Sequence, residues 1–288
     1  MRIDRLEAIN LCFEYPKRQG FTYAGGVCTG RLTSLILVHT DTGMVGVGSA
    51  YSHPALVHQI VQGQLDPILR GEDPLQVEAI FDLEPRLYSP HEAVAEGKNV
   101  EGGPVVLVDA ADCCGGGAAG DSVAVLRALI EANLRQPALV PVVDAEAAAA
   151  CHEARLGAKL TTCLGHKHDP KWGSPIAVTG RVAQLVGGRF RYSGGMWNGM
   201  EADMGPSAVL EIGSVQVLVT TYSTYDWVDE QFRVAGLNPA EAKFLVVKDP
   251  MNYRLAYGRI ARAVYVLNTP GPTPATEAVK KLLKKSLD

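Results

Sequence analysis

The sequence has no long hydrophobic run. No apolar stretch approaches the roughly 18 residues that a membrane span needs, and the first residues, MRIDRLEAIN, have no long apolar core of a signal peptide. Basic residues gather only at Lys280–Lys285, where they alternate with leucines, which favours a solvated helix end. Because the net charge is also only -4, we expect neither a nucleic-acid nor a membrane partner.

Two common catalytic signatures are missing as well. The six cysteines form no C-x-x-C pair, and the adjacent Cys113 and Cys114 are poorly placed to bridge each other, so we expect a cytoplasmic protein with free thiols. No G-x-S-x-G nucleophile elbow exists. Cys151 and His152 are neighbours on a predicted helix, where successive side chains point about 100° apart, which disfavours a thiol–imidazole dyad.

The chain of 288 residues is long enough for two domains. Its composition becomes polar and turn-rich at 89–103. We therefore predict a small α+β domain at 1–90, a linker at 91–103 and a mixed α/β domain at 104–288. In the first domain, three strands are expected to form an antiparallel sheet that is followed by helices, one of which begins at Asp73–Pro74; the strands are Met1–Asn10, Ser34–His39 and Met44–Gly48.

The second domain alternates strand and helix patterns. The first three strands with their connecting helices predict a βαβαβ unit with parallel strands; they are Val105–Asp109, Ala138–Val143 and Lys159–Leu164. Hairpin patterns follow at Ile176–Leu185 and Ser207–Tyr222. The α/β pattern then returns, with strands at Phe244–Lys248 and Ala263–Leu267. The fold class is therefore α/β.

The stretch VVLVDAADCCGGGAAGDS at Val105–Ser122 is the strongest local signal. Gly115, Gly117 and Gly120 fit G-x-G-x-x-G between a strand and a helix, which is the pattern of a dinucleotide site. However, two acids precede the loop and Asp121 lies where a pyrophosphate would bind, so an anion would be repelled. A P-loop fits less well, because Asp121 replaces its lysine. A tight connection built from small residues is the simpler interpretation.

A second cluster is a candidate for metal binding. His166, His168 and Asp169 lie close in sequence and could contribute nitrogen and oxygen ligands. Zinc takes three or four ligands from separate elements, so a polar loop after a strand is the alternative. No set of ligands that would suit magnesium is apparent.

Residues 103–274 resemble the C-terminal domain of the microcystinase MlrC-like metallopeptidases. The similar strings include GPVVLVDAAD at 103–112, LGHKHDP at 164–170, VGGRF at 186–190 and FLVVKDPMNYR at 244–254. The chain departs from that family at Cys113-Cys114, where Asn-Pro is usual, at Gly165–Lys167, where Gly-Gly-Lys is common, and at Asn252, where a histidine is common. The resemblance implies a zinc-dependent hydrolase, but the zinc-binding Asp and His residues of the family lie in a larger N-terminal domain that these residues do not match.

Residues 1–88 resemble the N-terminal capping domain of the enolase superfamily, of the mandelate racemase and muconate-lactonising type. The similar motifs are T-D-x-G-x-x-G-x-G at Thr40–Gly48 and L-x-G-x-D-P at Leu69–Pro74. The resemblance implies that loops of this region, with Tyr23, Tyr51 and His53, select a substrate. The catalytic barrel of that superfamily does not follow, because eight repeated strand–helix units are not seen.

Together, these patterns favour the hypothesis of an MlrC-like, hydrolase-related protein that acts on or binds a small peptide or amide. We expect such a protein to be inactive if the metal-bearing domain is absent. Two alternatives stay open: an enolase-type cap fused to a non-catalytic body, and an NAD(P)-binding oxidoreductase that uses residues 115–120. A homo-oligomer also stays open. The catalytic residues are unknown. The candidate ligand contacts are Asp109, Asp112, Gly116, Gly117, Asp121, Ser122, Lys248, Asn252, Tyr51 and His53.

Overall fold

The structure is a computed structural model that describes residues 1–14, 21–23, 26–28, 30–50, 54–76, 86–194, 197–226, 228–250 and 252–273. The chain divides into two compact units, Met1–Pro85 and Arg86–Asp288. Each unit is described separately below. In the part of the chain that the structure describes, no helix has the length and hydropathy to cross a membrane.

The first unit contains the predicted antiparallel sheet. Strands β1 (Ile3–Glu14), β4 (Gly30–Thr40) and β5 (Val45–Ala50) pair in the order β1-β4-β5. The tight turn between β4 and β5 places Gly43 at a φ of +80°, a conformation that favours glycine. A short pair, β2 (Phe21–Tyr23) and β3 (Gly26–Cys28), lies between β1 and β4 in the sequence. The sheet prediction is confirmed.

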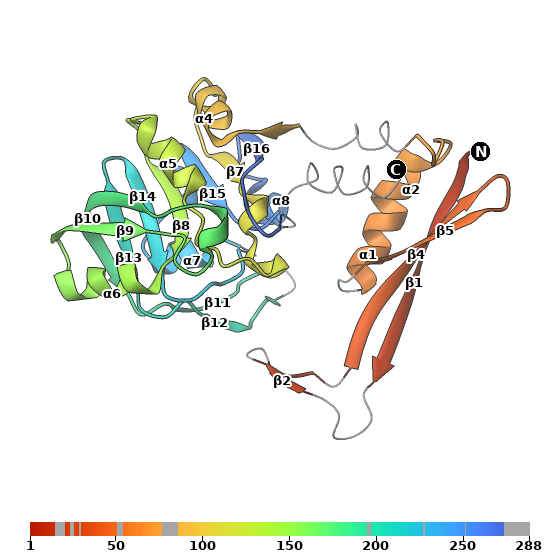
Figure 1. Ribbon diagram of the computed structural model, residues 1–288, viewed down its shortest axis with the longest axis horizontal. Coiled ribbons are helices and arrows are strands. Elements are labelled where there is room, and N and C mark those ends of the chain that lie inside the picture. Colours follow the sequence, from red (N-terminus) through yellow and green to blue (C-terminus); the bar gives the residue numbers. More distant parts are fainter. Residues whose placement is uncertain are drawn as a thin grey trace. The chain divides into compact units, whose positions relative to one another are not determined.

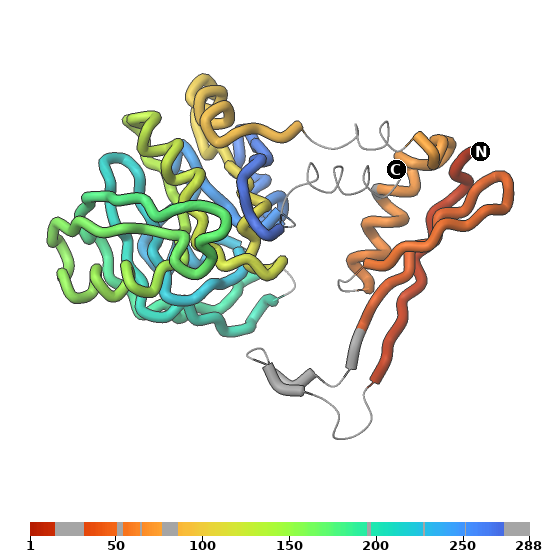
Figure 2. Tube along the Cα trace, viewed as in Figure 1, coloured from red at the N-terminus to blue at the C-terminus, as the bar shows by residue number. Residues whose placement is uncertain are grey.

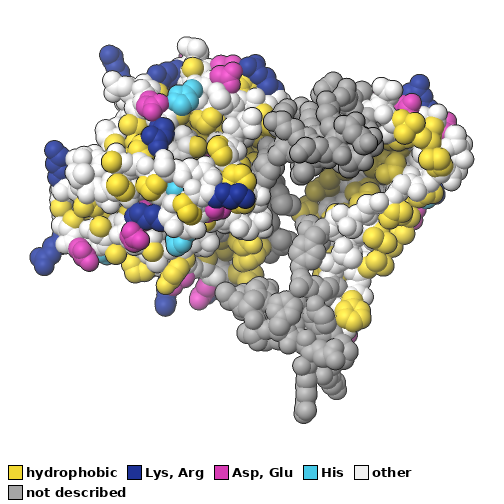
Figure 3. Space-filling view, viewed as in Figure 1, with side chains coloured by type: hydrophobic (Ala, Val, Ile, Leu, Met, Phe, Trp, Pro, Cys, Tyr) yellow, Lys and Arg dark blue, Asp and Glu magenta, His cyan; other side chains and the backbone are white. Residues whose placement is uncertain are grey.

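One face of this sheet packs against helices. Helix α1 (Pro54–Ile60), a π-helical turn (Val61–Leu65) and α2 (Asp66–Leu69) follow β5, and Val57 and Val61 form a small core with Ile3 and Leu6. The opposite face carries exposed hydrophobic side chains, which Figure 3 shows along this unit; they include Ile9, Leu11, Phe13, Val45 and Val47. The helix expected to begin at Asp73–Pro74 would fall mostly on 77–85, which lie outside the described residues.

The second unit is built around a nine-stranded mixed sheet (Figure 1) with the order β6-β16-β7-β15-β8-β14-β13-β10-β9. The strands from β6 to β14 in this order are parallel, and β13, β10 and β9 are antiparallel to their neighbours. The strands are β6 (Leu87–Tyr88), β7 (Val105–Val108), β8 (Ala138–Val143), β9 (Lys159–Leu164), β10 (Ile176–Val186), β13 (Ser207–Ile212), β14 (Val215–Thr220), β15 (Phe244–Val247) and β16 (Ala263–Leu267). A separate hairpin pairs β11 (Arg189–Arg191) with β12 (Glu201–Asp203).

Helices cover both faces of the sheet. Helices α4 (Pro90–Lys98), α5 (Ala124–Glu131) and α6 (Ala145–Ala154) contribute to one hydrophobic core, and α7 (Glu230–Val234) and α8 (Tyr253–Tyr257) contribute to the other. Val105 and Leu107 of β7 belong to the first core, whereas Val106 and Val108 belong to the second. A continuous run of buried residues is typical of a parallel strand with both faces covered. The α/β fold class is confirmed.

The position of β9 differs from the prediction. Lys159–Leu164 was expected to be the third parallel strand, but it lies at the edge of the sheet and pairs antiparallel with β10. Its exposed Lys159, Thr161 and Cys163 alternate with less exposed residues. Such alternation is typical of an antiparallel strand with one face in solvent, so the strand itself was predicted correctly and its direction was not.

Residues 90–98 form helix α4, where the polar composition suggested a linker. Ser89 accepts a hydrogen bond from the Glu92 N–H, and the Glu92 side chain accepts one from the Ser89 N–H, which together form a capping box. Ala93 and Val94 are buried in the core of the second unit. Figure 2 follows this unit from α4, in gold, to β16, in blue.

Candidate functional site

Several N–H groups of the glycine-rich loop after β7 donate hydrogen bonds to acceptors within the same loop. Asp112 accepts hydrogen bonds from the Gly120 N–H at 2.9 Å and the Ser122 N–H at 2.8 Å. The N–H groups of Gly116 and Gly117 donate to the carbonyls of Cys113 and Cys114, both at 3.0 Å. A loop that binds phosphate needs such N–H groups to face the ligand. In this chain the Asp112 carboxylate occupies the place of an anion, which disfavours a nucleotide there.

Lys248 is buried and holds this loop against the end of β15. Its Nζ donates to Asp112 Oδ2 at 2.7 Å and to the carbonyls of Gly120 at 2.8 Å and Ser122 at 3.0 Å. Burial by itself lowers the pKa of an ammonium group, but the carboxylates of Asp112 and Asp109 outweigh it, so the pKa of Lys248 is raised. Lys248 is therefore a charged group with all three donors used.

Two further carboxylates fix the loop that follows β9. Asp121 Oδ2 accepts hydrogen bonds from the N–H groups of His168 at 2.8 Å and Asp169 at 3.1 Å. Asp144 caps α6 through the Ala147 N–H. It also accepts from the Gly165 N–H at 2.9 Å and from Lys167 Nζ at 2.9 Å. Asp121 and Asp144 thus serve the internal structure of the unit.

The structure does not bring the predicted metal ligands together. His166 is buried, and its Nε2 accepts a long hydrogen bond of 3.5 Å from the Val123 N–H. His168 and Asp169 approach Asp121 through their backbones rather than their side chains. Across the described ranges, no three side chains of His, Cys, Asp or Glu are grouped so that they could hold a metal ion. The zinc that the family resemblance implies therefore does not fit the residues described.

Asp109 is another buried acid at the end of β7. The Thr269 hydroxyl donates to its Oδ1, and its Oδ2 has no hydrogen-bond partner among the described residues. Burial raises the pKa of Asp109 to about 6, against the opposing effect of the nearby Lys248. The group therefore lies inside the unit beside the Lys248–Asp112 pair.

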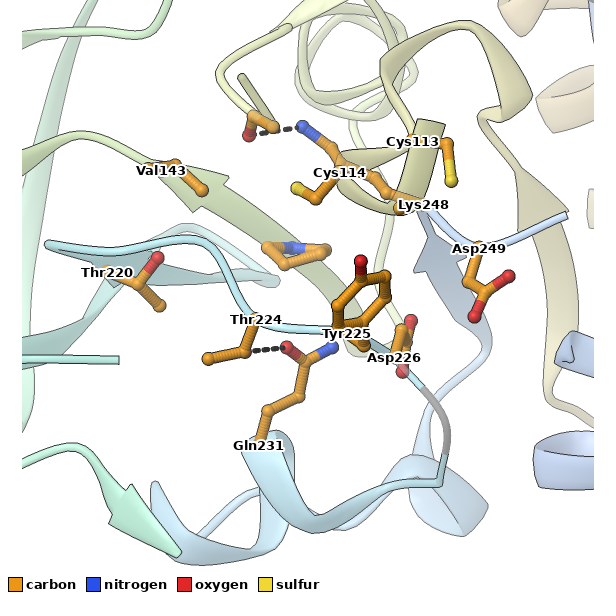
Figure 4. Close-up of a pocket in the computed structure, with 13 residues that line it drawn as sticks. Cys113, Cys114, Val143, Thr220, Thr224, Tyr225, Asp226, Gln231, Lys248 and Asp249 are labelled. Atoms are coloured by element: carbon orange, nitrogen blue, oxygen red, sulfur yellow. Dashed lines mark hydrogen bonds between the residues drawn. The ribbon is translucent and has the colours of Figure 1, made fainter. Parts of the chain in front are cut away.

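A cavity of about 30 Å³ opens beside this pair, at the carboxyl edge of the parallel sheet (Figure 4). Ligands of open α/β sheets bind at this edge. A volume of this size holds one or two water-sized groups. Its lining comes from the glycine loop, β8, the end of β14, the segment between β14 and α7, α7 and the residues that follow β15; it comprises Cys113, Cys114, Gly115, Gly120, Pro141, Val143, Thr220, Thr224, Tyr225, Asp226, Gln231, Lys248 and Asp249.

Asp226 is the most unusual polar group of the lining. It is 4% exposed, its Oδ1 accepts a hydrogen bond from the Tyr257 hydroxyl at 2.6 Å, and its Oδ2 has no partner in the described structure. Burial raises the pKa of Asp226 to about 8, against the opposing effect of hydrogen bonds from the Tyr257 and Gln231 side chains, and the nearby Asp249 carboxylate adds to the rise. Buried polar atoms almost always have partners, so the unpartnered oxygen points to a ligand or an ordered solvent molecule.

Two cysteine thiols and the aromatic ring of Tyr225 also line the cavity. Burial raises the pKa of Cys114 to about 12 and also raises the pKa of Cys113, so both thiols stay neutral at pH 7. The Tyr225 ring lies over Gly115, where an added Cβ would come within 2.6 Å of it, and its centroid is 4.8 Å from that of the tilted Trp197 ring. Glycine at this position therefore makes room for the aromatic wall.

Only one of the candidate ligand contacts, Lys248, lines the cavity in the part of the chain described. Asn252 donates to Asp249 at 3.1 Å. The other described candidates have the internal roles given above or lie outside the lining; Tyr51 and His53 fall outside the described residues.

The sequence reasoning missed Thr224, Tyr225, Asp226 and Gln231. A signal was present, since the largely polar run 221–226 directly follows the buried strand β14. This run reaches the cavity because β14 pairs in parallel with β8. The hairpin pattern in the sequence does not predict that pairing.

Comparison with known proteins agrees with this architecture. Microcystinase C from Sphingomonas sp. is 28% identical over 161 residues, which cover 56% of this chain and 31% of that protein. A crystal structure of a candidate metallopeptidase from Mesorhizobium sp. BNC1 matches with a TM-score of 0.61 and 24% identity, covering 81% of this chain and 44% of the other. The latter likeness shows the fold. The chain thus spans less than half the length of either relative.

Solved structures of enolase-superfamily proteins are also similar to part of the chain. A candidate mandelate racemase from Bordetella bronchiseptica RB50 is 28% identical with a TM-score of 0.27, covering 28% of this chain and 21% of the other. No activity is inferred from this similarity.

The decisive comparison is with a family model. The family described as the MlrC C-terminus matches residues 107–279, which include the glycine loop, Lys248 and every residue that lines the cavity. This chain belongs to the MlrC C-terminal family.

Proposed function

We propose that the chain binds a small peptide or amide at the cavity on the carboxyl edge of its parallel sheet. The observation that carries the proposal is the unpartnered Asp226 Oδ2 in the lining of that cavity. An amide offers both an N–H donor for a carboxylate and a carbonyl acceptor for a protonated acid. The membership of the MlrC family, whose named relatives include Microcystinase C, supports this class of ligand.

The size of the cavity limits which part of a ligand can enter it. With space for one or two water-sized groups, it accepts an end of a ligand rather than a whole peptide. Tyr225 supplies an apolar wall, and the Thr224 hydroxyl donates to Gln231 at 3.3 Å, which fixes the amide side chain of the lining. These groups orient a bound segment without any thiolate nucleophile.

We further propose that this chain alone does not hydrolyse the ligand. Peptide hydrolysis by a metallopeptidase requires a bound metal ion. The described residues offer no set of side chains that could hold such an ion. Metal analysis of the purified chain, together with a peptidase assay with and without added zinc, tests this part. Turnover that depends on stoichiometric zinc would contradict it.

Calorimetric titration with L-alanyl-L-alanine tests the binding itself. Thr224→Leu should fill the cavity and weaken binding at least about tenfold, because the larger side chain displaces the ligand's end. Thr161→Leu, on the exposed face of edge strand β9, is the matched control and should bind like the parent. No heat at millimolar dipeptide, or equal binding by both variants, would refute the proposed site.

A further inference from the structure

The two oxygens of the Asp226 carboxyl differ in their surroundings. Asp226 lines the cavity from the segment between β14 and α7, next to Tyr225 (Figure 4). Its Oδ1 accepts a hydrogen bond from the Tyr257 hydroxyl at 2.6 Å, whereas its Oδ2 has no partner among the described residues. Because Oδ1 already serves as an acceptor, a proton on this carboxyl belongs on Oδ2.

Burial keeps the Asp226 carboxyl neutral. The residue is 4% exposed, so an ionised carboxylate there would lose most of its hydration. Hydrogen bonds from the Tyr257 and Gln231 side chains favour the ionised form, but burial outweighs them and raises the pKa of Asp226 to about 8. At pH 7 the Oδ2–H group is therefore a buried donor that lacks an acceptor.

The rest of the lining favours a neutral acceptor over an anion. Lys248 is the only cationic side chain in the described lining, and its three N–H donors are directed to Asp112 and two backbone carbonyls. An anion would therefore find no free ammonium donor in that lining. A space for one or two water-sized groups admits a carbonyl group but not a whole peptide.

We propose that Asp226 is a neutral acid whose Oδ2–H donates a hydrogen bond to the carbonyl oxygen of the bound amide. This inference rests on the proposed function and names the ligand atom that enters the cavity. A buried donor without an acceptor costs free energy, and the carbonyl oxygen removes that cost. Recognition then depends on a neutral amide rather than on the charged ends of a peptide.

The inference fixes the direction of the pH dependence. Only the protonated carboxyl donates, so the affinity should be constant well below pH 8 and fall by about tenfold per pH unit well above it. Burial raises the pKa of Tyr192 and Tyr257, so both hydroxyls stay neutral over this range. The titratable and charged groups around Asp226 are Tyr257 on α8, Lys248 and Asp249 after β15, Asp229 and Glu230 at the start of α7, Cys113 and Cys114 of the glycine loop, Tyr192 and Tyr225.

Calorimetric titration of the full chain with N-acetyl-L-alanine N-methylamide tests the inference. This peptide has amide carbonyls and no titratable group, so any pH dependence belongs to the protein. We expect its affinity to fall by about five- to tenfold between about pH 8.5 and 9.5. A flat profile, or binding of L-alanyl-L-alanine but not of the blocked peptide, would overturn the inference and leave the proposed function standing. If neither peptide binds, both fail.

Two substitutions distinguish a neutral donor from a carboxylate. The amide of Asp226→Asn keeps one donor and one acceptor in nearly the same shape, so binding at pH 7 should stay within about threefold of the parent and lose its pH dependence. Asp226→Val removes the donor and should weaken binding about tenfold. Much weaker binding by Asp226→Asn would mean that the ligand needs an ionised carboxylate, which would overturn the inference.

The matched control is Glu146→Gln, an acid-to-amide change at a side chain of α6 that is 80% exposed. It should keep the affinity and the pH profile of the parent. Thermal unfolding checks that all three variants fold. Acetamide and acetate, which share one shape, separate a neutral carbonyl from an anion: acetamide should bind at least about tenfold more tightly at pH 7, and tighter binding of acetate would overturn the inference.

Discussion

Lys248 and Asp112 form a buried ion pair with an Nζ–Oδ2 distance of 2.7 Å, although 136 positions separate them in the chain. The pair joins the end of β15 to the glycine loop after β7. It also places two mutually neutralising charges beside the cavity, which Lys248 lines.

Removing one member of this pair should be costly. Lys248→Met leaves the Asp112 carboxylate buried without its cation, and we expect it to lower the free energy of unfolding by about 3–5 kcal/mol. The double variant Lys248→Met/Asp112→Asn should lose less, because no unpaired charge is left. Urea unfolding followed by tryptophan fluorescence measures this, since all three tryptophans belong to the second unit.

The control for this prediction is an exposed pair in the same unit. Arg189 and Asp203 lie 3.2 Å apart with side chains that are 88% and 45% exposed. Arg189→Met should change the free energy of unfolding by less than about 1 kcal/mol. A similar loss of unfolding free energy for Lys248→Met and Arg189→Met would show that the buried pair contributes no more to stability than the exposed pair.

Asp144 and Glu146 offer a second comparison, because both contact Lys167. The buried Asp144 also accepts hydrogen bonds from two backbone N–H groups, whereas Glu146 is 80% exposed. Asp144→Ala should cost about 2–4 kcal/mol of unfolding free energy, since it removes a helix cap and unpairs a buried loop. Glu146→Ala should stay within about 0.5 kcal/mol. Chemical denaturation distinguishes the two, and equal losses would contradict the assigned role of Asp144.

Two glycines of the loop should differ in their tolerance of alanine. Gly117 and Gly120 both have positive φ angles, +97° and +78°. At Gly120 an added Cβ would lie 2.7 Å from the Cys114 sulfur and 2.8 Å from Val143, while at Gly117 it would meet nothing within 4 Å. Gly117→Ala should therefore cost about 1 kcal/mol from backbone strain alone.

Gly120→Ala should cost at least about 2 kcal/mol, because a steric clash adds to the same strain. Thermal unfolding of the two variants and the parent measures the difference. A Gly117→Ala variant as unstable as Gly120→Ala would mean that the loop differs from the structure described.

The pKa of Asp226 predicts how stability depends on pH. Its folded pKa is about 8, against a usual 3.8, so the folded state holds a proton that the unfolded state releases. The stabilisation is complete below about pH 4 and is lost as the pH rises through about 8. Asp109, with a folded pKa of about 6, contributes mainly below pH 6.

Asp226→Asn should remove this dependence. Relative to the parent protein, its unfolding free energy should increase between pH 6 and 8 by up to about 1.4 kcal/mol per pH unit. Asp229→Asn should keep the slope of the parent. Urea titrations at several pH values, compared as differences between variant and parent, are the measurement; parallel curves for Asp226→Asn and the parent would contradict the pKa.

Much of the fold could be predicted because its signals are local. The bounds of β8 and β9 follow directly from their runs of apolar and alternating residues. The direction of β9 could not be predicted in this way, since the connection that follows it, rather than the strand, makes it pair with β10.

The candidate site required the tertiary structure. The sequence by itself determined the main strands of the sheet and the acidic character of the glycine loop, because hydrophobic periodicity and turn chemistry act over a few residues. Only the tertiary structure decided that the Asp112 carboxylate pairs with the distant Lys248 ammonium group, and that Asp226 has an unpartnered oxygen beside the cavity. The physical reason is that burial and hydrogen-bond pairing depend on which strand ends meet, and parallel order in a sheet is not written in any single segment.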